Sequence, residues 1–598
     1  TEHNPVSLFL ISRDSIFTGF FTELKRRIAH KLLPEAVDQR YLIDLFSLLF
    51  SKKSDEIWVN AVPDEVWLQL IVAIRFDEAN QEEVDACKLQ LASAVQVLSY
   101  RTTALGLEPE LLRNHPELEQ YTSPFIAQHN ELTKYLEMTD QNETIKEADV
   151  QHILVMLDQC KAVIHKIRRN SLQEGTSIRL TNILLQISKQ INRLEPLLHI
   201  LDYLNTKSLE KKQANTLEIV TLFKELVYCE RHKNDVRGHL HDNMQVMAIR
   251  VTENASQAGE HYITQNRKEY YALMRSAMGA GVVIALMALL KILLANMHFA
   301  PLTAAILFGL NYGFGFILIH LLHFTVATKQ PAMTAAAIAA SIDNADSHSS
   351  AVENLVKMIA NTMRSQMVAI LGNVALAIPV AMAIAWGIML LTGQHLLSVE
   401  KSTAYIDSID PINTGSLFYA AIAGVCLFLS GLIAGYHDNL AVYNKIPQRL
   451  RALTWLRNLL GEPLLRRFSN YIEHNLGALA GNFYFGCLLG GMSGLGVLLG
   501  LPVDIRHIAF SSAFTGFASV GLDFAITWQQ ALYAAFGLML IAFMNLTVSF
   551  SLALYVAIKS RKVRFAQWQT LLKTLGARLN QQPGEFVLPP KKTINIGE

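Results

Sequence analysis

Three side chains that can form ion pairs or exchange protons lie close together near the C-terminal end of the chain, at Asp504, Arg506 and His507. A long apolar run precedes them, and small, hydroxyl-bearing and apolar residues follow. Charged groups at the edge of a bilayer are costly unless they pair with one another or face water. The three residues are therefore either an ion-paired cap at the end of a membrane crossing or a gate that handles a solute.

Other polar side chains lie within apolar segments that are long enough to cross a bilayer: Asn311, His320, His323, Asn373, Asn482 and Asn545. Polar residues in such segments commonly hydrogen-bond neighbouring helices. They also line paths for solutes or protons, because they are expensive in lipid and usually face protein or water. The sequence leaves both interpretations open, and these residues complete the candidate gate or polar lining.

The nucleophiles of DNA recombination have only loose matches in the chain. Arg13 and Ser15 have the residue types of a serine recombinase, but the expected strand is missing from their surroundings. His165, Arg168 and Tyr203 roughly match the spacing of a tyrosine recombinase. They fall in amphipathic helical patterns, in which charged residues ordinarily cover the solvated face. We therefore assign no catalytic residue.

Metal and cofactor sites are not predicted either. His239, His241 and Asp242 have the types that begin a metal site, yet one short segment supplies too few ligands and no partner set follows. The five cysteines are odd in number, far apart and free of CxxC spacing. That pattern argues against a disulfide framework and against a thiolate zinc site.

The elements that must position these residues are predicted to be helices throughout. Residues 1–275 place apolar side chains at three- and four-residue spacing, which is typical of amphipathic helices. Six apolar stretches follow that are long enough to cross a bilayer, at about 277–296, 301–325, 367–391, 416–436, 476–500 and 529–557. The predicted fold is all-α, with a soluble domain at 1–275, a six-helix transmembrane domain at 276–558 and a basic tail at 559–598.

Charge divides the chain in the same way and predicts its orientation. Residues 1–275 hold 32 Lys and Arg against 38 Asp and Glu, a net charge of −6, and the remainder holds 20 against 13, or +7. An acidic soluble domain does not favour DNA binding, which usually relies on a basic face. The cation-rich loops all fall on one side of the bilayer, so both termini are predicted to be cytoplasmic, in a bacterial inner membrane.

Two consequences follow from this topology. A seventh crossing would put the basic tail outside, so residues 502–527 are predicted to be a re-entrant or interfacial segment on the outer side. The cations of one cytoplasmic loop are predicted to contact anionic lipids or a partner: Lys445, Arg449, Arg451, Arg457, Arg466 and Arg467. A second copy of the chain is an open alternative partner.

Short matches between the crossings suggest internal repetition. A Gly-Asn pair occurs in the third and fifth crossings, at 372–373 and 481–482, and Tyr-Ala-Ala occurs in the fourth and sixth, at 419–421 and 533–535. These matches predict three helical hairpins that enter the bilayer from the same side, as parallel repeats. Such repeats occur in transporters without being specific to them.

Three segments carry a family resemblance: "VTENASQAGEHYIT" at 251–264, "TKQPAMTA" at 328–335 and "GLPVDIRHIAFSSA" at 500–513. There the chain resembles a bacterial inner-membrane family described as site-specific recombinases. The resemblance implies DNA rearrangement as the activity, and it assigns no role to any residue of these segments. The residues themselves favour a transporter, a channel-like protein or an envelope scaffold, and a membrane-tethered DNA recombinase is the alternative.

Overall fold

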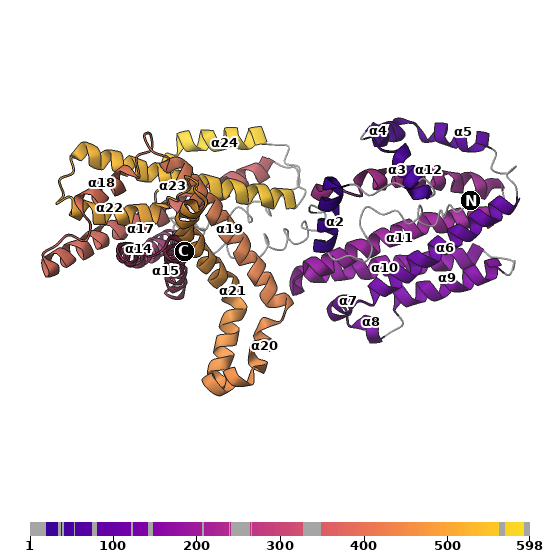
Figure 1. Ribbon diagram of the computed structural model, residues 1–598, viewed down its shortest axis with the longest axis horizontal. Helices are drawn as coiled ribbons and strands as arrows, with labels where there is room; N and C mark the ends of the chain where they lie inside the picture. Colours follow the sequence, from indigo (N-terminus) through magenta and orange to yellow (C-terminus); the bar gives the residue numbers. More distant parts are fainter. Residues whose placement is uncertain are drawn as a thin grey trace, which may run out of the picture. The chain divides into compact units, whose positions relative to one another are not determined.

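The computed structural model describes residues 20–33, 38, 41–52, 54–74, 81–120, 123–140, 147–205, 209–238, 240, 264, 266–326, 349–560 and 568–590. These residues form helices and connecting turns, with no strand among them, as the sequence predicts (Figure 1). The chain divides into two compact units, residues 1–247 and 248–598. The division precedes the predicted boundary at 275, because residues 267–275 form the first turns of a helix of the second unit.

The first unit consists of amphipathic helices: α2 (Phe20–Leu32), α3 (Leu42–Leu49), α4 (Ser54–Ala61), α5 (Asp64–Ile74), α6 (Gln81–Gly106), α7 (Pro109–Asn114), α8 (Glu117–Gln120), α9 (Pro124–Asp140), α10 (Glu147–Glu174), α11 (Ile178–Asn205) and α12 (Leu209–His232). Helix α11 packs against α6 and α12. Its Ile183, Ile187, Ile191 and Leu194 are buried at the three- and four-residue spacing that the sequence displays.

The second unit contains the apolar helices: α14 (Arg267–Asn296), α15 (Pro301–Leu321), α17 (Ser349–Thr392), α18 (Val399–Asp407), α19 (Ser416–Tyr443), α20 (Ile446–Ala452), α21 (Thr454–Leu499), α22 (Ile508–Gly521), α23 (Trp528–Ser560), α24 (Trp568–Gln581) and the 3-10 turn η2 (Pro583–Phe586). Among the described residues, six helices are long and apolar enough to span a membrane: α14, α15, α17, α19, α21 and α23. The six predicted crossings are thereby confirmed as apolar helices.

Two of these helices extend well beyond the apolar stretches that the sequence displays. Helix α17 has 44 residues and α21 has 46. Helix α21 is kinked at Gly461, which has a φ of +72° and lies two residues before Pro463. At 1.5 Å per residue, a helix of this length is about twice as long as the hydrocarbon core is thick. These extensions carry cations: Lys357 and Arg364 lie on α17, and Arg457, Arg466 and Arg467, predicted in a loop, lie on α21.

Glycines allow the second unit to pack closely. The Cα atoms of Gly486 and Gly490 on α21 face the backbone of α15 at Gly313 and Phe308, where an added Cβ would collide with main-chain atoms. Helix α15 therefore lies directly along α21, in the manner of small-residue contacts between membrane helices. Helix α14 packs along α17, and α19 packs along both α21 and α23.

A short helix is enclosed by the longer ones. Helix α22 has 14 residues, of which only Phe514 and Thr515 are not buried, and it packs against α17, α18, α14 and α23. Its length corresponds to about 21 Å, less than the roughly 30 Å of a hydrocarbon core. The segment at 502–527 thus contains a short, largely buried helix with irregular flanks, and its re-entrant or interfacial position stays a prediction.

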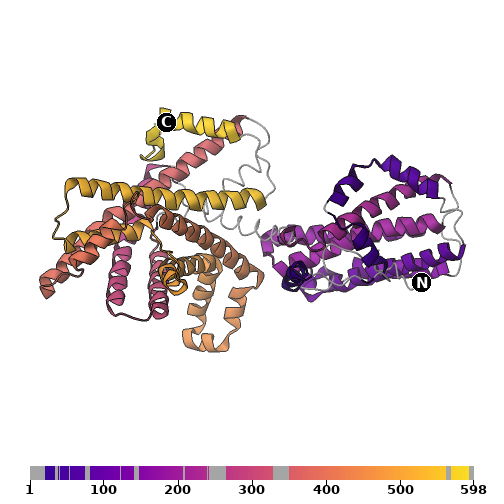
Figure 2. The same ribbon diagram turned by 45° about the horizontal axis from the view of Figure 1, so that its top comes forward.

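The C-terminal residues belong to the second unit as well. Figure 2 shows α24 and η2 beside the N-terminal part of α17. The Arg364 guanidinium donates to the carbonyl oxygen of Glu585 at 3.4 Å, and the Tyr270 hydroxyl donates to that of Val587 at 3.0 Å. Residues 568–590 of the predicted basic tail therefore pack on α17 and α14.

Candidate functional site

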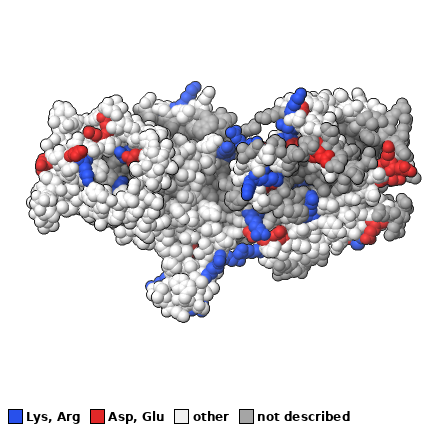
Figure 3. Space-filling view, in the orientation of Figure 1, with Lys and Arg blue, Asp and Glu red and all other residues white. Residues whose placement is uncertain are grey.

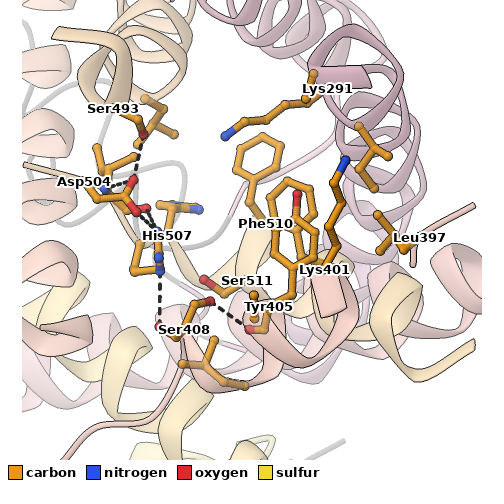
Figure 4. Close-up of a pocket in the computed structure, with 18 of the residues that line it drawn as sticks. Lys291, Leu397, Lys401, Tyr405, Ser408, Ser493, Asp504, His507, Phe510 and Ser511 are labelled. Carbon is orange, nitrogen blue, oxygen red and sulfur yellow. Dashed lines mark hydrogen bonds and ion pairs between the residues drawn. The ribbon is translucent and has the colours of Figure 1, made fainter. Parts of the chain in front are cut away.

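One cavity of about 450 Å³ lies in the second unit, at the end where α14 and α17 finish (Figure 4). Helices α14, α15, α18, α21 and α22 and residues 504–507 contribute its walls. Its polar lining consists of Lys291, Asn296, Tyr312, Lys401, Tyr405, Ser408, Ser493, Asp504, Arg506, His507 and Ser511. Figure 3 shows charged side chains around a hollow near α18, on a face that is otherwise mostly uncharged. We call this the charged cavity.

The predicted ion pair forms one wall of the charged cavity. The Arg506 guanidinium lies 2.5 Å from the Asp504 carboxylate, which also accepts from the Ser493 hydroxyl at 2.7 Å and from the Ile505 N–H at 2.8 Å. Burial alone would raise the pKa of the Asp504 carboxyl. The Arg506 charge and these hydrogen bonds outweigh that effect and hold the pKa below its usual value, so Asp504 is ionised at neutral pH.

The backbone fixes Arg506 in this place. Its Nε donates to the carbonyl oxygen of Ser408 at 3.2 Å, and its guanidinium lies 5.7 Å from the ring centroid of Tyr419. Its own N–H donates to the carbonyl oxygen of Tyr419 at 3.2 Å. The guanidinium is thus held at the cavity wall by α19 and by the turn after α18, and its orientation does not depend on Asp504 alone.

Two lysines complete the charge of the cavity. The Lys291 ammonium projects from α14 among three aromatic rings, 5.5 Å from the centroids of Phe308 and Tyr312 and 5.6 Å from that of Phe514. Within the described residues, no carboxylate lies within ion-pair distance of it. Cation–π contacts stabilise such an ammonium without neutralising it. The Lys401 ammonium, at the mouth, donates to the Asn296 side-chain oxygen at 2.9 Å.

His507 lines the cavity from the start of α22, yet it carries no charge at neutral pH. Its side chain is 2% exposed, and burial lowers its pKa to about 3. Its ring lies 5.6 Å from that of Phe485 in an edge-on contact. Asp504 and Arg506 therefore supply charge to the cavity, and His507 supplies a neutral polar part of its wall.

The predicted asparagines lie outside the lining of the charged cavity. The Asn373 carboxamide on α17 donates to the carbonyl oxygens of Ala277 at 2.7 Å and Thr325 at 3.0 Å. The Asn545 carboxamide on α23 donates to those of Ala420 at 2.8 Å and Arg506 at 2.9 Å. Asn545 also accepts from the Ile508 N–H at 3.0 Å. These contacts correspond to the hydrogen-bonding interpretation of the two residues.

The remaining predicted polar residues are also apart from the cavity. Asn311 donates to the carbonyl oxygen of Met287 on α14, and Asn482 donates within its own helix to that of Ala478. His320 lies 3.2 Å from the side-chain oxygen of Asn475 on α21. His323 follows the last turn of α15 with a φ of +55°. The structure therefore groups 504–507 with Lys291 and Lys401, and not with these residues.

The predicted lipid-contacting cations lie on α20, on the first turns of α21 and just before them. Arg451 is tied down, because its guanidinium donates to the Ser469 hydroxyl and the Asn470 side chain. Arg457 and Arg466 both lie 3.3 Å from Glu462. Large apolar side chains are exposed beside them: Leu453, Trp455, Leu459, Leu464 and Phe468. We call residues 445–468 the basic hairpin.

The recombinase candidates are not brought together in the described residues. His165 is exposed and Arg168 is half-buried on α10, where they lie three residues apart. Tyr203 is on α11, and its side chain is outside the described residues, as are Arg13, Ser15, His239, His241 and Asp242. The segments at 251–263 and 328–335 also lie outside them. Of the three signature segments, 500–513 is the one whose structure is described in full.

Sequence reasoning did not identify Lys291, Lys401, Tyr312 or Tyr405 as site residues. Lys291 lies inside an apolar stretch and Lys401 lies far along the chain from 504–507. Their shared position arises from three separate helices, α14, α15 and α18. The available signal was a lysine inside an apolar run without a nearby acid, which marks a functional candidate in a membrane helix.

A comparison with protein families finds a match over almost the entire chain. The model of a family described as "Site-specific recombinase" matches residues 1–589. No curated protein and no solved structure matches the chain.

Proposed function

The chain belongs to the site-specific recombinase family, and we propose that it is a multi-pass membrane protein that binds a small solute in the charged cavity and moves it across the bilayer. The observation that carries this proposal is the charged cavity itself. It places Lys291, Asp504 and Arg506 in a unit that contains six helices with apolar stretches of membrane-spanning length.

Charges in such a place call for a functional reason. Ionisable groups among membrane helices are expensive, and they usually face a protein interior or a water-filled path. A static scaffold gains nothing from two lysines without carboxylate partners. The volume of about 450 Å³ falls in the range of small-molecule sites, roughly 300–1,000 Å³.

A second feature supports transport, because the asparagine contacts occur twice. Asn373 joins a carbonyl of α14 to that of Thr325, after α15, and Asn545 joins a carbonyl of α19 to that of Arg506, after α21. In each case the asparagine of one helix (α17 or α23) binds a carbonyl of a second helix (α14 or α19) and a carbonyl just after a third one (α15 or α21). The helices α14, α15 and α17 therefore correspond to α19, α21 and α23.

A glycine one turn further along strengthens this correspondence. Gly281 lies four residues after Ala277, and an added Cβ there would lie 2.6 Å from the carbonyl oxygen of Asn373. Gly424 lies four residues after Ala420, and its added Cβ would lie 3.2 Å from the carbonyl oxygen of Asn545. The same close approach thus accompanies the same hydrogen bond in both halves.

The two halves would have opposite orientations. Six consecutive crossings alternate in direction, so the first and the fourth run oppositely, and so do each of the following pairs. Inverted repeats of this kind build many transporters, in which one half moves against the other around a central site. This arrangement differs from the three parallel hairpins that the sequence suggests, which stay a prediction.

The location of the protein is part of the same proposal. We place it in a bacterial inner membrane with both termini cytoplasmic, as the loop charges favour. The charged cavity would then open to the outer side, because it lies where α14 and α17 end. The basic hairpin would lie at the cytoplasmic face, near anionic headgroups, where each cation contributes about 1 kcal/mol of attraction.

The family description supports a second candidate function, a membrane-tethered site-specific DNA recombinase. The acidic first unit does not favour it, since DNA affinity depends on neutralising phosphates with cations. The two functions predict different results for the purified full chain. Strand exchange between DNA duplexes, lost on His165→Ala or Tyr203→Phe substitution, would support the recombinase and contradict our proposal.

Transport is tested with the full chain reconstituted into liposomes. A panel of radiolabelled small solutes that differ in charge is offered outside, and accumulation inside is followed with time. We expect saturable uptake of at least one solute, with loss of uptake on Arg506→Gln substitution and retention in the matched control Arg467→Gln. Binding of a solute without any uptake would overturn transport and leave a sensor or scaffold.

A further inference from the structure

We infer that the ligand of the charged cavity is a small organic anion, with a carboxylate or phosphate group held by Lys291, Lys401 and Arg506 and an apolar body against aromatic rings. The inference deepens the proposed function and rests on the same cavity. It concerns binding, so it can fail while transport stands, and transport can fail while it stands.

The charge of the lining points to an anion. Among the residues that line the cavity, Lys291, Lys401 and Arg506 are cations and Asp504 is an acid. The Asp504 carboxylate already has its partners, because its oxygens accept hydrogen bonds from the Arg506 guanidinium, the Ser493 hydroxyl and the Ile505 N–H. Two ammonium groups in the lining therefore stay without a carboxylate. An anionic group between them would pair with both, in hydrogen bonds that charge strengthens.

The positions of the two lysines support a shared ligand. Lys291 reaches in from α14, and the charges of both Asp504 and Arg506 act on its ammonium. Lys401 comes from α18 at the mouth and is held beside the end of α14 by its bond to Asn296. Figure 4 shows the Lys291 side chain directed toward the side of Asp504, and Lys401 on the opposite side of the cavity from Asp504.

The apolar wall predicts the rest of the ligand. Tyr405 and Phe514 stack with an interplanar angle of 2° and a centroid distance of 4.8 Å. Tyr312 and Phe510 stack at 18° and 4.0 Å. Stacked rings form a rigid, flat surface that binds aromatic or aliphatic groups well. An inorganic ion would leave this surface uncovered, so the geometry favours an anion with an apolar body.

The hydroxyl of one lining residue, Tyr312, is a further hydrogen-bonding group for the ligand. Tyr312 is 2% exposed, and its hydroxyl oxygen is buried with no hydrogen-bond partner among the described residues. Buried hydroxyls normally have a partner. A ligand oxygen that enters between Lys291 and the Tyr312 ring could supply it. A cationic ligand would instead meet two ammonium groups and one free donor, and a neutral ligand would leave both lysines unpaired.

The test is binding by isothermal titration calorimetry, with the full chain purified in a nonionic detergent. The probes share one ring and differ in charge: phenyl phosphate, benzoate, benzyl alcohol and benzylamine. We expect phenyl phosphate and benzoate to bind and the other two not to bind. The Lys291→Gln and Lys401→Gln variants should each weaken anion binding about tenfold or more, the effect of losing one charged hydrogen bond.

Matched variants separate charge from folding. Lys559→Gln removes a lysine from the other end of the unit and should leave binding unchanged. Lys291→Arg keeps the charge and should retain binding within about threefold, a difference below 1 kcal/mol. If Lys291→Gln fails to fold, Lys401→Gln and Lys291→Arg still decide the outcome. Benzylamine binding, or anion binding that is equally strong in both Gln variants, would overturn the inference.

The anionic group could belong to a soluble metabolite or to a lipid headgroup, and a further arm distinguishes the two sources. The chain is placed in nanodiscs of phosphatidylcholine with or without phosphatidylglycerol, and phenyl phosphate is titrated into both. An unchanged affinity for phenyl phosphate supports a soluble anion. A weaker affinity in the nanodiscs with phosphatidylglycerol supports the headgroup, if this difference between the two nanodiscs disappears in the Lys291→Gln variant. Either result leaves the anionic chemistry in place, whereas no binding in both nanodiscs contradicts it.

Discussion

Asn373 and Asn545 make the same pair of hydrogen bonds at two places in the membrane unit. Each carboxamide donates to a carbonyl of a neighbouring helix and to a carbonyl in the chain after the next helix, at distances of 2.7–3.0 Å. In an apolar environment these carbonyls have no water to replace the asparagine. Each asparagine therefore holds together the helices of one half, and we propose that the two halves move against each other.

Removal of either carboxamide should destabilise the unit. Asn373→Ala and Asn545→Ala each remove two buried hydrogen bonds to carbonyl oxygens, and Asn545→Ala also leaves the Ile508 N–H without its acceptor. The expected loss is about 1–3 kcal/mol for each variant. The exposed Asn458 on α21 provides the control, since Asn458→Ala removes the same side chain from the surface. Unfolding in detergent, followed by circular dichroism, measures the difference. Equal stability of the three variants would show that the paired contacts do not hold the helices of each half together.

The close approach at Gly281 should not tolerate even a methyl group. In the Gly281→Ala variant the new Cβ would lie 2.6 Å from the carbonyl oxygen of Asn373, so α14 and α17 must separate. Overpacking of this kind costs about 1–3 kcal/mol. Gly387 on α17 has open space around an added Cβ, and Gly387→Ala should be neutral or slightly stabilising. A melting temperature for Gly281→Ala that is no lower than that for Gly387→Ala would contradict the close contact.

His507 should make the stability of the unit sensitive to acid. Its pKa is lowered to about 3 by burial, whereas an exposed histidine titrates near 6.5. The folded state therefore keeps His507 neutral while the unfolded state gains a proton as the pH falls below 6.5. The stability that His507 contributes is complete above pH 6.5, declines by up to about 1.4 kcal/mol per pH unit below it, and is lost below about pH 3.

The pH dependence of unfolding between pH 7 and pH 4 tests this explanation. In the His507→Phe variant an aromatic ring without titrating nitrogens replaces the imidazole, so the unfolding free energy should fall less steeply with acid than in the unchanged chain. Parallel curves for the two proteins would assign the acid sensitivity to other groups.

How far the sequence predicts this protein depends on the distance between the residues involved. The apolar runs of α14 and α19 are local, so hydropathy alone identifies them as spans. The Asp504–Arg506 pair is local too, and the prediction places both charges at one site. The approach of Lys291 to that pair depends on packing between α14, α15 and α21, so the sequence does not group Lys291 with the pair.

The same reasoning explains the missed helix ends. Arg364 on α17 carries a charge, so hydropathy starts the span only at about residue 367, after Arg364, and predicts a loop before it. The structure continues the helix there, because the Arg364 guanidinium donates to the carbonyl oxygen of Thr264 at 2.6 Å and to the Asn361 side chain at 2.8 Å. A charge that is satisfied by a distant part of the chain cannot be distinguished from a loop charge by its sequence alone.

The basic hairpin should retain anionic lipid around the protein. We expect the triple variant Arg457→Gln, Arg466→Gln and Arg467→Gln to copurify with less phosphatidylglycerol, since each cation near a surface contributes about 1 kcal/mol. Quantitative mass spectrometry of lipids bound to the purified chain measures the change. Removal of three cations from the first unit, at Lys134, Lys166 and Arg179, should have no effect. Equal loss in both triple variants would indicate a general charge effect.

Uptake of a small organic anion by liposomes that contain the full chain tests the central claim most directly. We predict time-dependent, saturable uptake of a labelled aromatic carboxylate or phosphate that falls at least about tenfold on Lys291→Gln substitution, and that persists in the Lys559→Gln control. Uptake that is absent from the unchanged chain, although the same anion binds in detergent, would contradict a transport function for the charged cavity.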